Sequence, residues 1–365
     1  MLTDIESVKK RNLGQIVVTP TRLYTAHSRA LTTLYSDLES YASQQREVFI
    51  GTAGTVLERA NAAGFRFYAR QYYDGEGKQR ENYLCGPIGD AQADARARDM
   101  RTRIEEIKDL VPSLRLLGRE GFNLADSRTY ATLASLHNYG VFSAGGILIG
   151  SHAYGVLINQ LGVRAATYTT EDIDIARCEA LAFETLPEQG FLEMLRDSGI
   201  EFVAVPQLDR KLPATSFKQR GKTRFHVDLL VPSSNEEFPV LPVPELKAYA
   251  TGLPYLKYLL QESQMAMLMA REGCCNVRVP LPERFAVHKL IVSQLRTNRG
   301  AKSGKDVFQA CVLLAAMADR YSDAIESALK RVPKPARKYL KPAIESGRSL
   351  LEAAYPRAWN ALTAT

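Results

Sequence analysis

The chain lacks the features that mark membrane-spanning, secreted and disulfide-rich proteins. Its 365 residues contain no apolar run of about 18, and its start, MLTDIESVKKRN, has no apolar centre of the signal-peptide kind. The five cysteines are odd in number and include no CxxC pair, which argues against a disulfide framework and a structural zinc site. Internal repeats and low-complexity segments are also lacking. We therefore expect a cytoplasmic protein with no membrane partner.

Length and charge indicate how the chain is organised. The apolar content of 45% is enough for a large core, and 365 residues favour two or three domains. The net charge of +7 is unevenly distributed, because residues 276–365 contain 16 Lys and Arg against 7 Asp and Glu, a net of +9. This C-terminal part either binds a polyanion or carries its charges on solvated helices.

Residues 1–125 are predicted to be helical with an inserted β-hairpin. Thr19 and Pro20 form a helix start, and a stripe of leucines follows them. Another helix is predicted from residue 90 to about residue 110, with Pro112 marking its end.

The hairpin is predicted at about residues 64–87. Aromatic and polar side chains alternate on both sides of the sequence DGEG at residues 74–77, which is typical of two strands joined by a turn. The exposed face would carry Arg66 and Arg70 among several tyrosines, a mixture that suits base stacking and phosphate contact. A small stabilising sheet with half-buried tyrosines is the alternative.

Residues 126–245 are predicted to form an α/β core, and residues 246–365 a mostly helical, basic domain. The core begins with a helix over 126–139 and alternates strands and helices up to the strand TRFHVDLLVP. The last part is predicted to contain a helix within 245–270, then a strand leading into helices, with a break near Val332-Pro333. The predicted fold class is α+β.

The sequence GGILIGSHAY at residues 145–154 places a glycine and a serine between a strand and a helix. A P-loop is excluded because Ser151 and His152 stand where Lys and Ser or Thr are required, and GxGxxG is excluded by Ile147. What remains is a tight turn whose N–H groups and serine hydroxyl lie at a helix N-terminus, where an anion such as a triphosphate is favoured. The alternative is that Ser151 only caps the helix.

Three aspartates follow on two predicted strands. One residue separates Asp172 from Asp174, so both project from the same face, and two carboxylates that close repel unless a cation lies between them. Asp228 lies in a later apolar strand, where an unpaired carboxylate is costly. Three carboxylates beside an anion turn predict a two-metal site for phosphoryl transfer, with Mg²⁺ as the natural ion.

These motifs in this order resemble the nucleotidyltransferase fold of the DNA polymerase β superfamily, in which Gly-Ser, DxD and a third Asp follow one another. YLCGP, HKLIVSQLR and KDVFQACVLL extend the similarity to a bacterial nucleotidyltransferase family related to abortive-infection and toxin nucleotidyltransferases. The resemblance implies a mixed-sheet core, Mg²⁺ or Mn²⁺ as cofactor, and an NTP such as ATP as substrate.

The resemblance also implies which residues bind the nucleotide. Gly150 and Ser151 would hold the triphosphate, and Lys289 in VHKL would contact it as well. Lys305 and Asp306 would steady the helical domain against the nucleotide.

The metal ions are assigned in the same way. Asp172 and Asp174 would bind both ions, and Asp228 would complete the one that activates the acceptor hydroxyl. His152 and His226 lie beside these motifs as alternative acid/base groups or as ordinary structural histidines.

No motif names the acceptor. We expect RNA, such as a tRNA 3′ end, because of the toxin-like relatives, the basic C-terminal part and the hairpin. The candidate acceptor-binding residues are Arg66, Arg70, Lys334, Arg337 and Lys338. The alternatives are a small molecule or a protein side chain as acceptor, and a non-catalytic scaffold that binds nucleotide or a partner. The oligomeric state and a cognate antitoxin are left open.

Overall fold

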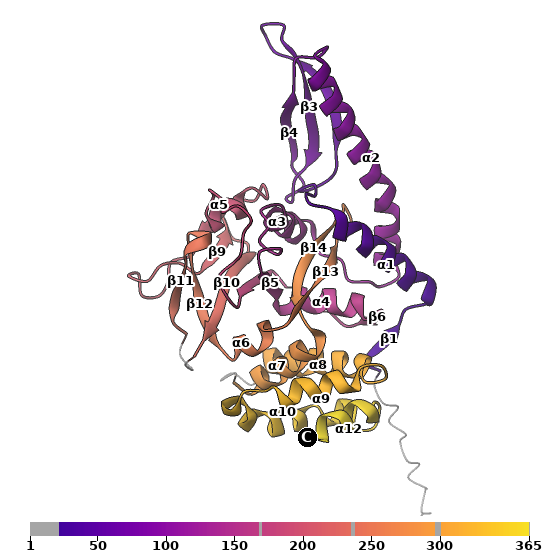
Figure 1. The fold of residues 1–365 in the computed structure, drawn as a ribbon, viewed down its shortest axis with the longest axis vertical. Coiled ribbons are helices and arrows are strands. Elements are labelled where there is room, and N and C mark those ends of the chain that lie inside the picture. Colours follow the sequence, from indigo (N-terminus) through magenta and orange to yellow (C-terminus); the bar gives the residue numbers. More distant parts are fainter. Residues whose placement is uncertain (1–21, 168–169, 235–237, 296–300, 365) are drawn as a thin grey trace, which may run out of the picture.

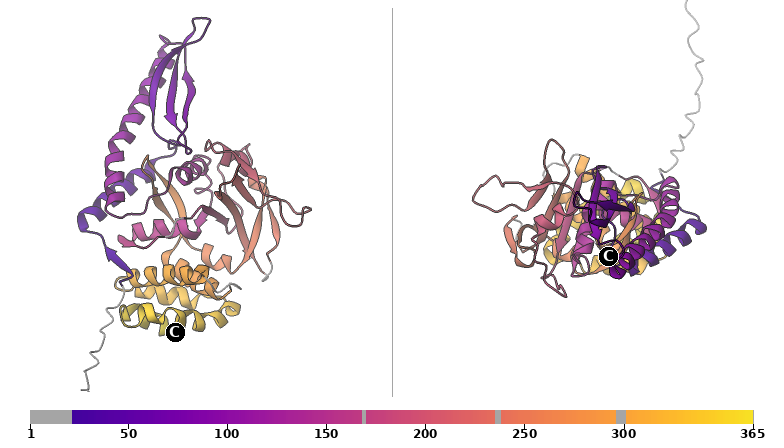
Figure 2. Two further views of the ribbon diagram at one scale, coloured as in Figure 1. Left: turned by 180° about the vertical axis from the view of Figure 1, so that it is seen from behind. Right: turned by 90° about the horizontal axis from the view of Figure 1, so that it is seen from above.

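A computed structural model describes residues 22–167, 170–234, 238–295 and 301–364 (Figure 1). An arm projects from one end, a mixed sheet lies in the middle, and a layer of helices closes the other end, as the turned views also show (Figure 2). The predicted α+β class is confirmed. None of the helices in these ranges combines the length and the apolar character that a membrane crossing requires.

The central sheet holds the predicted aspartates. Its strands are β5 (Gly146–Ile149), β7 (Asp172–Arg177), β8 (Phe202–Ala204), β9 (Ser216–Gln219), β10 (His226–Ser233), β11 (Val240–Val243) and β12 (Ala248–Pro254). They lie in the order β11-β12-β10-β7-β5, with β9 also paired to β10 and β8 to β9. β10 is parallel to β7 and β12, whereas β5 is antiparallel to β7. The sequence of β5, GILI, is buried throughout, while β7 alternates half-buried aspartates with buried isoleucines.

Helices cover the sheet, and the start of α3 follows from local sequence. They are α3 (Ser127–Asn138), α4 (Gly150–Gln160) and α5 (Phe191–Arg196), with a short 3₁₀ turn, η1 (Pro244–Leu246). Asp126 caps α3 by accepting the N–H groups of Arg128 and Thr129, so the helix predicted there is confirmed.

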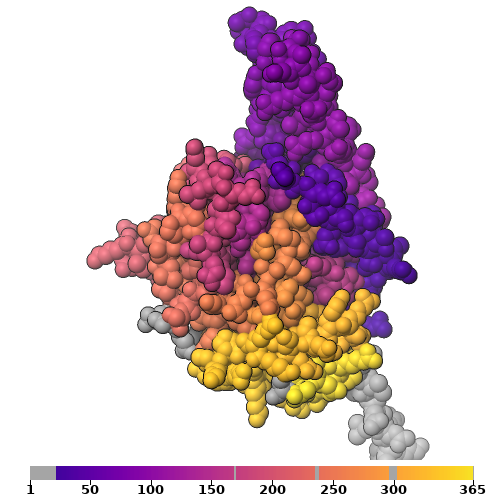
Figure 3. Space-filling view, in the orientation of Figure 1, coloured from indigo at the N-terminus to yellow at the C-terminus, as the bar shows by residue number. Residues whose placement is uncertain are grey.

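The arm stands out clearly from the body (Figure 3). It consists of β2 (Thr55–Ala60), β3 (Arg66–Tyr73), β4 (Gln79–Cys85) and the long α2 (Ala91–Arg119). The predicted hairpin is confirmed as β3 and β4, and β2 is an additional strand on the other edge of β3. The hairpin turn lies at the base of the arm, because a Cβ on Gly75 would stand 2.8 Å from Ala131 Cβ in α3.

The prediction that Pro112 ends a helix is wrong, because α2 continues through it to Arg119. Proline removes one N–H donor and crowds the preceding turn. Leu114 and Leu117, which follow it, are buried against Tyr35 and Phe122. This packing holds the last turns of α2 in place against the local preference.

The N-terminal described residues differ in part from the helix predicted for them. Tyr24–Ala26 forms the strand β1, which pairs antiparallel with β6 (Val163–Ala165). The helix α1 (Arg29–Gln44) begins after Ser28, whose side chain accepts the Leu31 N–H. The predicted start at Thr19 and Pro20 lies outside the described residues.

The last part of the chain contains more strand than predicted. Besides β12, residues 246–280 include the hairpin β13 (Ser263–Met269) and β14 (Cys274–Pro280), and the predicted helix is limited to α6 (Leu256–Leu260). The later helices are α7 (Pro282–Leu295), α8 (Ala301–Met317), α9 (Ser322–Lys330), η2 (Lys334–Tyr339), α10 (Leu340–Ser346), α11 (Arg348–Leu351) and α12 (Pro356–Thr363). The predicted break at Val332-Pro333 falls between α9 and η2. The domain boundaries themselves stay predictions.

One hydrophobic core joins the sheet to the C-terminal helices. Its buried members include Leu133 of α3, Ile173 of β7, Leu290 of α7 and Leu351 of α11. Side chains of α7 and α8 are therefore held in place relative to the sheet. The arm has two small clusters of its own, one of them around Tyr68.

Candidate active site

The structure brings the three predicted aspartates together on neighbouring strands. β7 and β10 are parallel, with Asp174 opposite Asp228 and Asp172 opposite His226. Since side chains alternate along a strand, all three carboxylates lie on one face of the sheet. The last residue of β5, Ile149, pairs with Asp174, so the Gly-Ser turn that follows β5 lies beside this carboxylate.

The turn requires a glycine at residue 150 for two reasons, its backbone conformation and its closeness to Asp174. Its φ of 70° lies in the left-handed region, which favours glycine. A Cβ at this position would stand 2.1 Å from Asp174 Oδ2. A glycine at residue 150 is therefore what lets the turn approach the aspartates.

The start of α4 lies next to a polar pocket. Its N-cap position is Ile149, and in the described part of the chain no side chain caps it, so the alternative of Ser151 as a helix cap is wrong. A pocket of about 200 Å³ is lined by residues 123–126, Ser151, His152, Thr167 and Thr170. Unpaired N–H groups of a first helical turn and hydroxyl groups are donors that suit an anion.

The surroundings of Asp174 change the pKa of its carboxyl group. Burial, and next the charges of Asp228 and Asp172, raise its pKa from 3.8 to about 6. The positive charges of Lys289 and His226 act in the opposite direction and are smaller. A site with this balance has an excess of negative charge that a cation would compensate.

Asp228 is held from two sides. Ser216 in β9 donates a hydrogen bond to Oδ1, and His226 Nε2 lies 3.5 Å from Oδ2. The contact with Asp228 is the main reason that the pKa of His226 is raised to about 9, with a smaller contribution from its hydrogen bond to the Arg224 carbonyl. His226 is therefore protonated at neutral pH and acts as a fixed positive partner of Asp228.

Lys289 lies in α7, where its positive charge acts on Asp174, and it has a protein partner of its own. Its Nζ lies 2.7 Å from Asp306 Oδ1 in α8, and the Asp306 side chain is only 2% exposed. Lys305 is half-buried nearby, and burial and the charge of Lys289 lower its pKa. The C-terminal helices thus bring positive charge to the aspartates.

The residues at this place suit a divalent cation by their chemistry. Mg²⁺ prefers oxygen ligands, and three carboxylates share one face here, one of them with a raised pKa. As the side chains stand, no three His, Cys, Asp or Glu residues within the described ranges are grouped as ligands of a metal ion. Asp172, Asp174 and Asp228 are the residues that would hold it.

His152 differs from His226 in its surroundings. Burial lowers the pKa of His152, and its Nε2 atom is buried without a hydrogen-bond partner among the described residues. The imidazole is therefore neutral at pH 7 and lines the pocket at the start of α4.

The predicted acceptor-binding residues do not come together. Arg66 is exposed on the arm and pairs with Glu58 at 2.9 Å. Arg70 differs from expectation: it is half-buried, stacks on Phe49 and Tyr72, and donates to backbone carbonyls of residues 52 and 53. The remaining three are exposed on η2, at the opposite end of the molecule from the arm (Figure 1), namely Lys334, Arg337 and Lys338.

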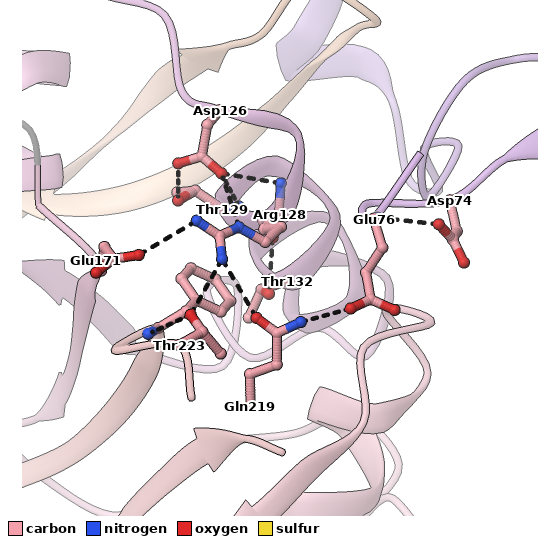
Figure 4. A network of polar contacts seen from close by, with 10 residues as sticks. Asp74, Glu76, Asp126, Arg128, Thr129, Thr132, Glu171, Gln219 and Thr223 are labelled. Atoms are coloured by element: carbon pink, nitrogen blue, oxygen red, sulfur yellow. Dashed lines mark hydrogen bonds and ion pairs between the residues drawn. The ribbon is translucent and has the colours of Figure 1, made fainter. Parts of the chain in front are cut away.

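Arg128 is a residue that the sequence prediction missed. It lies in the first turn of α3 and reaches side chains of β9, of the loop before β10 and of the residue before β7 (Figure 4). An arginine in the first turn of a capped helix is common on protein surfaces. Its partners lie 43 to 95 residues away in sequence, so no local pattern could have indicated them.

A family model described as nucleotidyltransferase matches residues 127–333, more than half of the chain, and the chain therefore belongs to this family. The match includes the Gly-Ser turn, the three aspartates and Lys289. Among solved structures, the chain is similar to an antigenic nucleotidyltransferase-like protein from Paracoccidioides brasiliensis, with 16% identity and a TM-score of 0.30 over 60% of this chain and 92% of that one. A comparison with curated proteins found no match.

Proposed function

We propose that the protein transfers a nucleoside monophosphate from an NTP to an acceptor hydroxyl, with Mg²⁺ or Mn²⁺ as cofactor. The observation that supports this most is the register of β7 and β10, which places Asp172, Asp174 and Asp228 on one face beside the Gly-Ser turn. Membership of a nucleotidyltransferase family supports nucleotidyl transfer in general.

In this reaction the acceptor oxygen forms a bond to the α-phosphorus, and the bond from that phosphorus to the bridging oxygen breaks, so that pyrophosphate leaves. Divalent ions, when bound, would neutralise charge that develops on the phosphates. Ser151 and the first N–H groups of α4 would hold the leaving phosphates. The proton of the attacking hydroxyl would pass to a carboxylate or to water.

We propose RNA as the acceptor, for instance a tRNA 3′ end. The basic stretch 276–365 has a net charge of +9, and the exposed η2 cations lie at the opposite end of the molecule from the arm, whose strand β3 carries Arg66. An extended polyanion could contact both ends, whereas a small molecule could not. A toxin-like role with a cognate antitoxin stays a prediction.

The function is tested by incubating the protein with each labelled NTP in turn, Mg²⁺ and total cellular RNA. Asp174→Ala is the control, because it removes one of the proposed metal ligands. Label in RNA that depends on Asp174 would support the proposal. Label in protein or in a small molecule would change the acceptor, and consumption of no NTP would indicate a non-catalytic scaffold.

RNA as acceptor is tested by salt and by charge reversal. Log K for RNA should fall with log salt by about 0.7 for each phosphate contact of a single strand, while NTP binding should respond less. Reversing Lys334, Arg337 and Lys338 to Glu together should weaken RNA binding and transfer to RNA, yet leave slow NTP hydrolysis unchanged. Equal loss of both activities would indicate misfolding, and no loss of either would favour a small-molecule or protein acceptor.

A further inference from the structure

The guanidinium of Arg128 joins three segments at the edge of the site (Figure 4). One terminal nitrogen, Nη1, donates to Gln219 Oε1 at 3.3 Å and to Thr223 Oγ1 at 3.2 Å. The other, Nη2, lies 3.4 Å from Glu171 Oε1, and Cζ lies 4.9 Å from the centre of the Phe225 ring. We propose that Arg128 is a positioning residue that holds the ends of both aspartate-bearing strands. Its effect on turnover rests on the proposed function, but its effect on the strand ends does not.

Two of these contact residues lie one position ahead of the two strands. Glu171 directly precedes Asp172 at the start of β7, and Phe225 directly precedes His226 at the start of β10. The Glu171 carbonyl accepts the His226 N–H at 3.0 Å, so the strands are joined at this end. A shift of either end would move Asp172 relative to Asp228, and a misplacement of about 1 Å can slow a reaction about a hundredfold.

Arginine is the residue type that this arrangement requires. Its planar group donates in several fixed directions while its face stacks on an aromatic ring. Here it serves two neutral oxygens, those of Gln219 and Thr223, and the Glu171 carboxylate at once. A lysine has one nitrogen and could keep the ion pair with Glu171, but it would lose the other contacts and the stacking on Phe225.

Gln219 extends the network to the arm. Its Nε2 donates to Glu76 Oε1 in the turn between β3 and β4 (Figure 4). The turn is packed directly on α3, since a Cβ on Gly75 would lie 3.1 Å from the Ser127 carbonyl oxygen and 3.4 Å from Arg128 Cα. Gln219, which accepts from Arg128, therefore also links the strand ends to the base of the arm.

The test compares Arg128→Ala and Arg128→Lys with the wild-type full chain. Without substrate, the backbone amides of residues 223–228 should exchange with solvent about tenfold faster in both variants, because hydrogen bonds of a charged group are lost, while those of β13 and β14 should not change. The kcat for transfer should fall about ten- to a hundredfold, with KM for the NTP within about threefold. The matched control for exchange is Arg101→Ala, which removes a guanidinium 5.3 Å from the Tyr68 ring in the arm and should leave the exchange of residues 223–228 unchanged.

Unchanged exchange of residues 223–228 in Arg128→Ala, or a wild-type kcat in Arg128→Lys, would overturn the proposal. A raised KM with kcat retained would also overturn it, because Arg128 would then contact the nucleotide itself. If Arg128→Ala does not fold, Thr223→Val removes one partner at constant shape and should give a smaller effect in the same direction, and no effect on exchange would refute the assignment. A wild-type protein that transfers nothing would contradict the proposed function alone, since the exchange measurement needs no substrate.

Discussion

Replacing Asp174 by Asn should stabilise the metal-free protein at neutral and alkaline pH. Burial and the charges of Asp228 and Asp172 raise the pKa of Asp174 from 3.8 to about 6. The folded protein thus binds a proton at this carboxyl more tightly than the unfolded chain does, so the ionised carboxylate opposes folding. Asparagine has nearly the same size and no charge, and it removes this opposition.

The magnitude follows from the pKa. A change from 3.8 to about 6 corresponds to about 3 kcal/mol in the free energy of unfolding, at about 1.36 kcal/mol per pKa unit. Since the Asn amide must still be accommodated, we expect a gain of about 1–3 kcal/mol at pH 8. The ionised Asp174 destabilises the folded protein fully above pH 6, and this destabilisation disappears as the pH falls toward 3.8. The stability gained by Asp174→Asn should therefore be small at pH 4.

The assay is urea unfolding with EDTA at pH 8 and at pH 4, followed by circular dichroism. Asp37→Asn, at an exposed carboxylate of α1, is the control and should change stability by less than about 0.5 kcal/mol. In the presence of Mg²⁺ and NTP, the stabilised Asp174→Asn protein should show no transfer, because a proposed metal ligand is gone. The reasoning would be refuted by a variant no more stable than wild type at pH 8, or by an equal gain at both pH values.

Three further predictions concern the neighbours of Asp174. Gly150→Ala should lower stability by about 1–2 kcal/mol and abolish transfer, because residue 150 has a left-handed φ and its new Cβ would collide with Asp174; a thermal melt and a transfer assay check this. Ser151→Ala should weaken NTP binding about tenfold to a hundredfold by calorimetry, and unchanged affinity would place the phosphate site elsewhere. Lys289→Met should lower the free energy of unfolding in urea by about 3–5 kcal/mol because it removes the ammonium that lies 2.7 Å from the buried Asp306 carboxylate, and adding Asp306→Leu should recover most of that loss.

The aspartates and the Gly-Ser turn could be predicted from the sequence because they follow from local patterns. The i, i+2 spacing of Asp172 and Asp174 fixes their common face once the segment is a strand, and a glycine before Ser151 marks a turn wherever the two strands lie. Asp228 needed only one long-range assumption, that its strand joins the same sheet. The register of β10 with β7 meets that assumption.

What could not be predicted depends on contacts between distant segments. Arg70 was expected on an exposed face, but the strand face that carries it packs against Phe49, a residue outside the hairpin. Pro112 signals a helix end locally, and packing of Leu117 in a cluster with residues of α1 and β13 overrides that signal. Arg128 acquires its role only when β9, the loop before β10 and Glu171 meet, which no spacing in the chain encodes.

The arm has small hydrophobic clusters that are separate from the main core, and this affects how the protein unfolds. Tyr68, Cys85, Ala93 and Ala97 form one cluster, and Phe49, with few partners, anchors the other. Units with so little buried apolar surface open at lower free energy than a large core does, so the arm should melt and be cut by proteases as a cooperative unit before the sheet does. Substitutions on the outer surface of the arm would then cost the sheet little stability, so the arm can vary in sequence without disturbing the strands that carry the aspartates.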